Sequence, residues 1–137
     1  MTHKHGLLMA AACAALLTCG SPVLAVYAKA AAPAAPTHEV VQELMRKDFV
    51  GAPGKELLML TVEYLPGGAS LPHRHNAQVL VYVLSGTMHM QVKGSPVLTL
   101  GPGQTFYEGP SDEHTVSENA SQTEAAKILV FEVKDKS

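Results

Sequence analysis

From residue 40 onward, short apolar runs rich in β-branched residues alternate with turns marked by Pro and Gly. The runs include KELLMLTVEY, VLVYVL and KILVFEV, and segments such as PGG, KGSP, GPG and GPSD separate them. About eight runs follow one another at the spacing of a β-sandwich or β-barrel, and VVQELMRK at 40–47 fits an entry strand or a helix turn. The rhythm predicts one all-β domain over residues 40–137, closed around one cavity.

The first thirty residues do not share this rhythm. Lys4 lies near the start, the short apolar stretch GLLMAAACAALL follows, and small residues come after it. This stretch is shorter than the roughly 20 residues of a membrane-spanning helix, and its flanks suit cleavage after Ala25 or Ala30. We therefore expect residues 1–30 to be a cleaved secretory signal peptide and the protein to be periplasmic or secreted.

The segment at residues 31–39, AAPAAPTHE, is rich in Ala and Pro and predicts a short flexible spacer. Both cysteines, Cys13 and Cys19, lie in the expected signal peptide, so the mature chain would have no thiol for a disulfide or a metal. The sequence LLTCG around Cys19 also loosely resembles a bacterial lipoprotein signal. A lipid anchor at that cysteine is the alternative to simple export.

The charge balance is mildly acidic. Ten Lys or Arg residues stand against twelve Asp or Glu residues, which gives a formal net charge of −2. No basic cluster follows the leader, so nucleic acid and anionic membrane surfaces are poor partners for this chain. A small molecule bound in the cavity is the partner that we expect.

The stretch LPHRHNAQVLVYVLSG at residues 71–86 places two histidines one residue apart, directly ahead of an apolar run. Side chains at positions i and i+2 of a strand point to the same face, so His73 and His75 can direct both imidazoles at one point. Such a pair suits capture of a divalent metal, although two histidines near a loop are also compatible with plain solvation.

The residues around this pair match a known motif, and at this point the chain resembles the cupin superfamily. The first cupin motif reads Gly, five residues, His-x-His, three or four residues, Glu, six residues, Gly. Gly67, His73, His75 and Gly86 stand in its register.

The second cupin motif reads Gly, five residues, Pro-x-Gly, two residues, His, three residues, Asn. Gly103 and His114 match it, Gly109 and Ser111 take the proline and glycine positions, and Asn119 comes one residue late. The resemblance implies a small single-domain jelly-roll barrel preceded by the leader.

The resemblance also implies a metal site. In metal-binding cupins the two histidines and the glutamate of the first motif and the histidine of the second hold a divalent ion. Carried over residue by residue, the ligands are His73, His75 and His114. Three imidazoles can bind Zn, Cu, Ni, Fe or Mn, and the loss of an acidic ligand would favour Zn or Cu over Fe.

The acidic ligand is missing because Val79 occupies the glutamate position. Two side chains could supply an oxygen instead: Gln78, if a bulge altered the strand alternation, or Glu108 from the opposite strand. Tyr107 and Glu108 are also the candidates for a general acid or base.

Strand alternation gives an expectation for the cavity lining. A hairpin turning at Ser85-Gly86 would pair VLVYVL with TMHMQV. The residues expected to line the cavity are then Val79, Val81, Val83, Met88 and Met90.

Two functions remain open from the sequence. One is a metal-dependent enzyme acting on a small molecule, such as an oxygenase or an isomerase. The other is a non-catalytic module that binds a metal or a sugar-type ligand, which Val79 favours. The resemblance also implies a homodimer, paired through an edge strand such as VVQELM or KILVFEV.

Overall fold

The computed structural model describes residues 38–136. The expected signal peptide, Cys19 and nearly all of the expected spacer lie outside the described residues. Within those residues no helix is long and apolar enough to cross a membrane.

The described chain consists of eight β-strands, which confirms the all-β fold class. The strands are β1 (Glu39–Asp48), β2 (Lys55–Tyr64), β3 (Ala77–Ser85), β4 (Met88–Val92), β5 (Leu98–Leu100), β6 (Thr105–Glu108), β7 (His114–Asn119) and β8 (Ala126–Asp135). The segment at 40–47 is therefore the entry strand and not a helix turn, and its pairing with β2 begins at Glu39.

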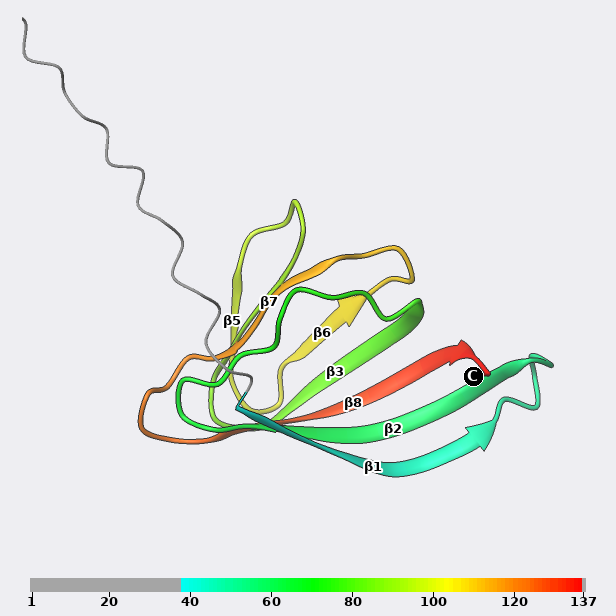
Figure 1. The fold of residues 1–137 in the computed structure, drawn as a ribbon, viewed down its shortest axis with the longest axis horizontal. Coiled ribbons are helices and arrows are strands. Elements are labelled where there is room, and N and C mark those ends of the chain that lie inside the picture. The colour runs from blue at the N-terminus through cyan, green and yellow to red at the C-terminus, as the bar shows by residue number, and fades with distance from the viewer. Residues whose placement is uncertain (1–37, 137) are drawn as a thin grey trace, which may run out of the picture. The chain divides into compact units, whose positions relative to one another are not determined.

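The strands form two antiparallel sheets. The five-stranded sheet has the order β1-β2-β8-β3-β6, and the three-stranded sheet has the order β5-β4-β7. Figure 1 shows them as separate layers that come together at one end. Because β8 pairs with both β2 and β3, KILVFEV has no free edge, whereas β1 is an edge strand.

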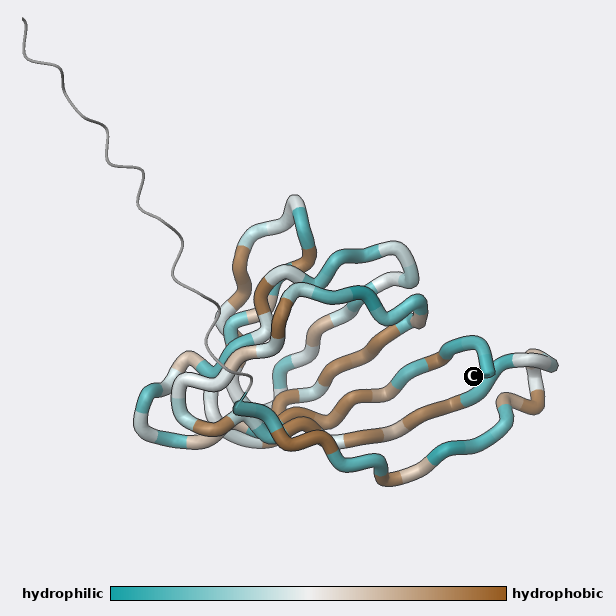
Figure 2. Tube along the Cα trace, viewed as in Figure 1, coloured by the Kyte–Doolittle hydropathy of each residue, from teal (hydrophilic) through white to brown (hydrophobic). Residues whose placement is uncertain are grey.

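The core lies between the inner faces of the two sheets. In β3 the burial alternates strictly, with the odd-numbered positions from Ala77 to Val83 buried and the even-numbered positions exposed. Apolar segments accordingly run along β2, β3 and β8 in Figure 2. The three-stranded sheet contributes Met88 and Met90, both fully buried. This alternation is what a strand with one buried face requires.

The predicted hairpin across Ser85-Gly86 is wrong. β3 pairs with β6 and β8, while β4 pairs with β5 and β7, so the chain crosses from one sheet to the other at this turn. Because β6 and β8 occupy the two edges of β3, β4 has no edge of β3 with which to pair. Gly86 makes the crossing with a φ of 73°, and a Cβ at this position would lie 2.6 Å from the Cα of Ala126.

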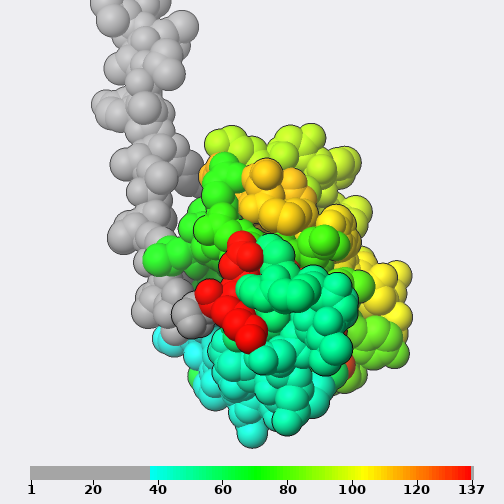
Figure 3. Space-filling model, turned by 90° about the vertical axis from the view of Figure 1, so that its right-hand side faces the viewer, coloured from blue at the N-terminus to red at the C-terminus, as the bar shows by residue number. Residues whose placement is uncertain are grey.

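The C-terminal end of β8 is held against the turn between β1 and β2. Lys136 donates its backbone N–H to the carbonyl of Gly54 at 3.0 Å, and Lys55 forms an ion pair with Asp135 at 2.7 Å. In Figure 3 the C-terminal residues, in red, lie against the β1–β2 turn, in teal.

Candidate metal centre

His73 and His114 face each other across a backbone bridge. The segment before β3 runs antiparallel to β7 at this point, and His73 pairs with His114. Their backbones exchange two hydrogen bonds of 3.1 and 2.9 Å. Directly opposed residues of an antiparallel pair present their side chains on the same face, and the two ring centroids are 5.2 Å apart.

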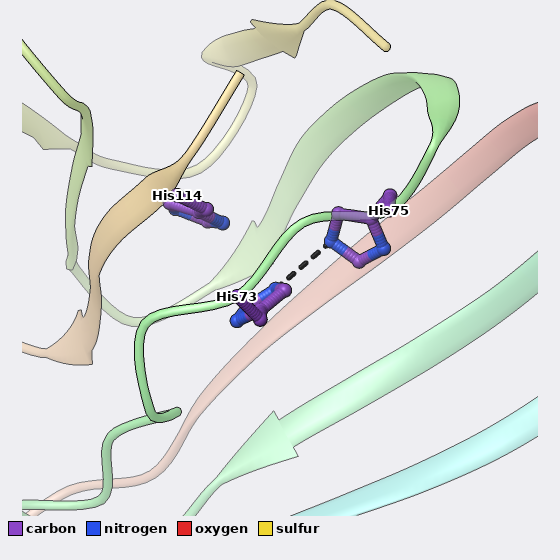
Figure 4. A group of neighbouring side chains, drawn as sticks. All are labelled: His73, His75 and His114. Carbon is purple, nitrogen blue, oxygen red and sulfur yellow. Dashed lines mark hydrogen bonds between the residues drawn. The ribbon is translucent and has the colours of Figure 1, made fainter. Parts of the chain in front are cut away.

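His75 completes the cluster from the same segment. Its Nε2 lies 2.9 Å from the Nε2 of His73, and the two rings meet edge to face. Figure 4 shows both rings on the segment ahead of β3 and His114 on β7. One ligand atom from each histidine lies within 4.8 Å of the others. The structure thus brings together the three histidines that the motif spacing singled out.

Two buried glutamates flank the position of Val79. In the register of the large sheet, Val79 lies opposite Glu108 of β6 on one side and Glu132 of β8 on the other. Glu108 Oε1 is 3.1 Å from His114 Nδ1, and Glu108 Oε2 is 3.7 Å from His75 Nε2. Glu132 Oε1 lies 3.3 Å from His75 Nδ1. Carboxylates therefore surround the histidines although the motif glutamate is missing.

The contact between His75 and Glu132 shifts the titration of both groups. The Glu132 carboxylate raises the pKa of His75 above its usual range, against the opposing effect of burial, and the nearby charge of Glu108 adds to the rise. The same contact holds the pKa of Glu132 below its usual range. The contact thus favours the protonated form of His75 and the ionised form of Glu132.

His114 is the residue whose surroundings call for a ligand. The side chain is 4% exposed, and neither ring nitrogen has a hydrogen-bond partner among the described residues. Its Nδ1 lies close to Glu108, but without hydrogen-bond geometry. Buried polar atoms without partners are costly and rare. Two ligands about 2.1 Å from one ion and at right angles lie about 3 Å apart. The 2.9 Å between the Nε2 atoms of His73 and His75 and the 3.1 Å between His114 Nδ1 and Glu108 Oε1 match this spacing.

Gln78 and Tyr107 do not join the cluster. Gln78 is exposed on the outer face of β3, because the alternation of that strand is unbroken there. Tyr107 is 54% exposed and belongs to the outer face of β6. Glu108, the next residue, is 3% exposed and points inward to the histidines. Of the three proposed donors or acid-base groups, only Glu108 reaches the site.

Other motif residues shape the backbone around the site. Asn119 is buried, and its side-chain NH₂ donates to the carbonyls of Tyr64, Leu65 and Glu124 at 2.7–3.2 Å. Its amide oxygen accepts a hydrogen bond from the backbone of Ser121. Asn119 therefore fixes the turn between β7 and β8 without contacting the histidines.

The histidines open onto a cavity of about 390 Å³ between the sheets. Its apolar wall consists of Val41, Leu60, Val62, Leu71, Val79, Val81, Ile128 and Val130. The expectation is confirmed for Val79 and Val81, whereas Val83, Met88 and Met90 are buried in the core and do not line the cavity. All three belong to the packed core beside the turn from β3 to β4.

A chain of hydroxyl groups lines another part of the same cavity. Ser70 donates its hydroxyl proton to Glu39, so its oxygen accepts from the hydroxyl of Tyr64 at 2.9 Å. The Tyr64 oxygen in turn accepts from Ser117 at 2.9 Å. Burial raises the pKa of Tyr64, which keeps the phenol protonated. Every proton points toward Glu39, which leaves Ser117 Oγ with free lone pairs.

The sequence interpretation missed Glu132 and the hydroxyl chain. Glu132 shares the inward parity of Ala126, Ile128 and Val130 in β8, and a carboxylate at such a position is a signal of a functional or ion-paired site. Tyr64 and Ser117 carry no comparable signal, because tyrosine and serine are common in strands without any functional role. Their meeting depends on the contact between two sheets.

Two antiparallel sheets around a histidine-bearing cavity define a small jelly-roll barrel with a candidate metal centre. The cupin domain family model matches residues 60–132, more than half of the chain, and the protein belongs to this family. No curated protein sequence matches the chain.

Solved structures share this fold. A recombinant oxalate oxidase in complex with glycolate is 24% identical with a TM-score of 0.58, over 74% of this chain and 53% of that one. The TT1209 protein from Thermus thermophilus is 21% identical with a TM-score of 0.58, over 77% and 91%. The Schizosaccharomyces pombe Cnp3 cupin domain is 13% identical with a TM-score of 0.60, over 71% and 61%. The chain spans about half of the oxalate oxidase, and these identities show the fold alone.

Proposed function

We propose that this cupin holds one divalent metal ion through His73, His75 and His114 and binds a small molecule in the adjoining cavity. The observation that carries the proposal is the buried His114, whose two ring nitrogens have no hydrogen-bond partner among residues 38–136. Neutral imidazoles are ligands for Zn, Cu, Ni, Fe and Mn, and a cation would satisfy the ring nitrogen that faces it.

The bound ion would supply Lewis acidity, polarising an oxygen of the ligand or activating water or dioxygen. The chain itself supplies a wall of aliphatic side chains on one part of the cavity, and low polarity strengthens electrostatic interactions beside it. Glu108, next to two of the histidines, is the inward carboxylate of the candidate acid-base pair. An oxygenase and an isomerase both suit this arrangement.

The cavity favours a small ligand with an apolar body and a hydrogen-bond donor. A volume of about 390 Å³ lies at the lower end of the usual range of ligand sites, roughly 300–1,000 Å³. Ser117 offers lone pairs and no proton, so it recognises a hydroxyl or N–H group of the ligand. An oxalate oxidase of this fold is known in complex with glycolate, a small hydroxy acid, and this supports a ligand of similar size here.

The proposal is tested by elemental mass spectrometry of the purified protein after incubation with Zn²⁺, Mn²⁺ or Cu²⁺ and gel filtration. We expect close to one ion per chain in the wild type and little in His73→Ala or His114→Ala. The matched control is His89→Ala, because His89 lies on β4 and contacts Glu118 at 3.1 Å, outside the cavity. A wild type that retains no ion, or a His114→Ala variant that retains all of it, contradicts the proposal.

The second candidate is a non-catalytic module for a metal or a sugar-type ligand, favoured by Val79 in place of the motif glutamate. Metal binding without turnover in a screen of small hydroxy acids and sugars would support the module. Metal-dependent consumption of one of these compounds would support the enzyme.

We also propose export to the periplasm or the medium, on the pattern of residues 1–30. Intact-mass measurement of the exported protein tests this. A chain that begins at Val26 or Ala31 supports cleavage of a secretory signal, whereas a lipidated chain that begins at Cys19 supports the anchor. A cytoplasmic full-length chain contradicts both.

A further inference from the structure

Three inward positions lie side by side across the large sheet at the level of the histidines. They are Glu132 on β8, Val79 on β3 and Glu108 on β6, with Val79 in the middle. All three are buried, at 6%, 1% and 3% exposure respectively. The position that carries the motif glutamate is apolar here, and a carboxylate stands on each side of it.

The two carboxylates contact different sides of the cluster. Glu132 lies against Nδ1 of His75, whereas the Nε2 of that ring faces His73. Glu108 lies against that Nε2, at 3.7 Å, and against His114 Nδ1, at 3.1 Å. Glu108 is therefore on the side of His75 where the three rings converge, and Glu132 is on the opposite side of the ring.

We propose that Glu108 supplies the acidic metal ligand in place of the motif position held by Val79, and that Glu132 orients His75 through its Nδ1. The inference rests on the proposed metal site. It assigns the acidic role to a residue of the neighbouring strand, so the ligand has moved sideways across the sheet.

Sheet geometry makes this replacement possible. Opposed residues of an antiparallel pair have Cβ atoms about 4.5–5.5 Å apart, so side chains from positions 79 and 108 start close together on the same face. Glu108 reaches the cluster from its own strand, at 3.1 Å from His114 Nδ1 and 3.7 Å from His75 Nε2. Glu132 then has the role of the carboxylate that fixes the ring of a metal-binding histidine from its far nitrogen.

The replacement changes which ions the site should prefer. Three imidazoles alone suit Zn²⁺ and Cu²⁺, whereas a carboxylate oxygen raises the affinity for harder ions such as Mn²⁺. A site that includes this carboxylate would therefore favour zinc and copper less than three imidazoles alone would. With Glu108 as a ligand, the site retains one negative charge toward the ion.

The test is calorimetric titration of the full chain with Mn²⁺ and with Zn²⁺ separately. Glu108→Gln keeps the size of the side chain and removes its charge. We expect this variant to lose at least about 100-fold in Mn²⁺ affinity and clearly less in Zn²⁺ affinity. The matched control is Glu132→Gln, a buried glutamate at the same level, which should weaken both ions to a similar extent, by about 10–100-fold.

A rescue variant separates ligation from packing. Val79→Glu combined with Glu108→Gln moves the carboxylate back to the motif position, and we expect it to recover Mn²⁺ affinity relative to Glu108→Gln. If Glu108→Gln does not fold, Glu108→Asp keeps the charge but withdraws the oxygen by one methylene. This shorter variant should show the same selective loss of Mn²⁺ affinity.

The outcomes distinguish the two proposals. A wild type that binds neither ion overturns the metal site and the ligand assignment together. If the wild type and Glu108→Gln bind Mn²⁺ equally tightly, the histidine site remains in place but the role of Glu108 is overturned. Equal losses for both ions in Glu108→Gln and Glu132→Gln, without rescue by Val79→Glu, also overturn it.

Discussion

Val79 fills the motif glutamate position with an aliphatic side chain that is 1% exposed, between two buried carboxylates. The Glu132 carboxylate raises the pKa of His75, because its negative charge stabilises the protonated imidazole. A metal ion bound to His75 would compete with this proton. Metal affinity in this site should therefore rise with pH, because the imidazole must be neutral to bind.

The pair formed by His75 and Glu132 gives a prediction for the stability of the metal-free protein. The raised pKa of His75 stabilises the folded protein. This stabilisation is complete at pH values below the ordinary histidine pKa of 6.5 and is lost as the pH rises through the raised pKa. The lowered pKa of Glu132 contributes stability above its ordinary value of 4.5, and this is lost as the pH falls through the lowered value. The stabilisation is greatest between these two ordinary values.

The measurement compares urea unfolding of the wild type and Glu132→Gln, both in chelator, from pH 4 to 9. We expect the difference in unfolding free energy to be largest between about pH 4.5 and 6.5 and to shrink on both sides. A difference that does not vary with pH would show that Glu132 acts through packing alone.

Gly86 gives a second prediction at this scale. Alanine there must adopt a positive φ, and its Cβ would lie 2.6 Å from Ala126. We expect Gly86→Ala to lower the free energy of unfolding by about 2–5 kcal/mol, from backbone strain and overpacking together. Gly94→Ala is the control, because its φ is also positive but nothing lies within 4 Å of the added Cβ. Equal losses in the two variants would rule out the clash with β8.

At the scale of elements, β1 is attached to the large sheet along one edge only. Arg46 of β1 pairs with the buried carboxylate of Glu56 on β2, and Lys134 of β8 lies 3.9 Å from the same carboxylate. The strand is otherwise exposed along nearly its whole length. A pair that neutralises a buried charge contributes more than a surface pair, because its loss leaves the charge unsatisfied.

We expect Arg46→Met to lower the free energy of unfolding, since Glu56 then keeps only the more distant Lys134. The effect should be smaller when Glu56→Gln is already present. Chemical denaturation of the four proteins of this double-mutant cycle measures the coupling. A coupling close to zero would mean that the contact does not hold β1 in place.

For the whole molecule, the homodimer stays a prediction. Of the two segments expected to pair across the dimer, VVQELM and KILVFEV, only the first lies on an edge strand, β1. Val40 and Val41 are both 59% exposed on this edge strand. We expect a dimer by light scattering after gel filtration and a monomer for Val40→Lys, because a charge on an edge blocks strand pairing. Leu98→Lys, on the edge strand β5, should leave the dimer intact. A monomeric wild type contradicts this prediction.

The sequence was sufficient for the strand rhythm and for the three histidines. The rhythm reports local alternation, and the histidines follow from fixed motif spacing. Strand pairing is a different matter: the turn at Gly86 predicts a hairpin, yet the partners of β3 are β6 and β8. For the same reason Glu132 was not seen, because its place beside Val79 depends on which strands are neighbours.

The most direct test of the account is anomalous X-ray diffraction at the metal edge from crystals loaded with Mn²⁺ or Zn²⁺. The account predicts one peak inside the barrel, about 2.0–2.2 Å from a ring nitrogen of each of His73, His75 and His114, with a Glu108 oxygen in its coordination shell. No peak at the three histidines, or one bound only at the protein surface, would contradict it.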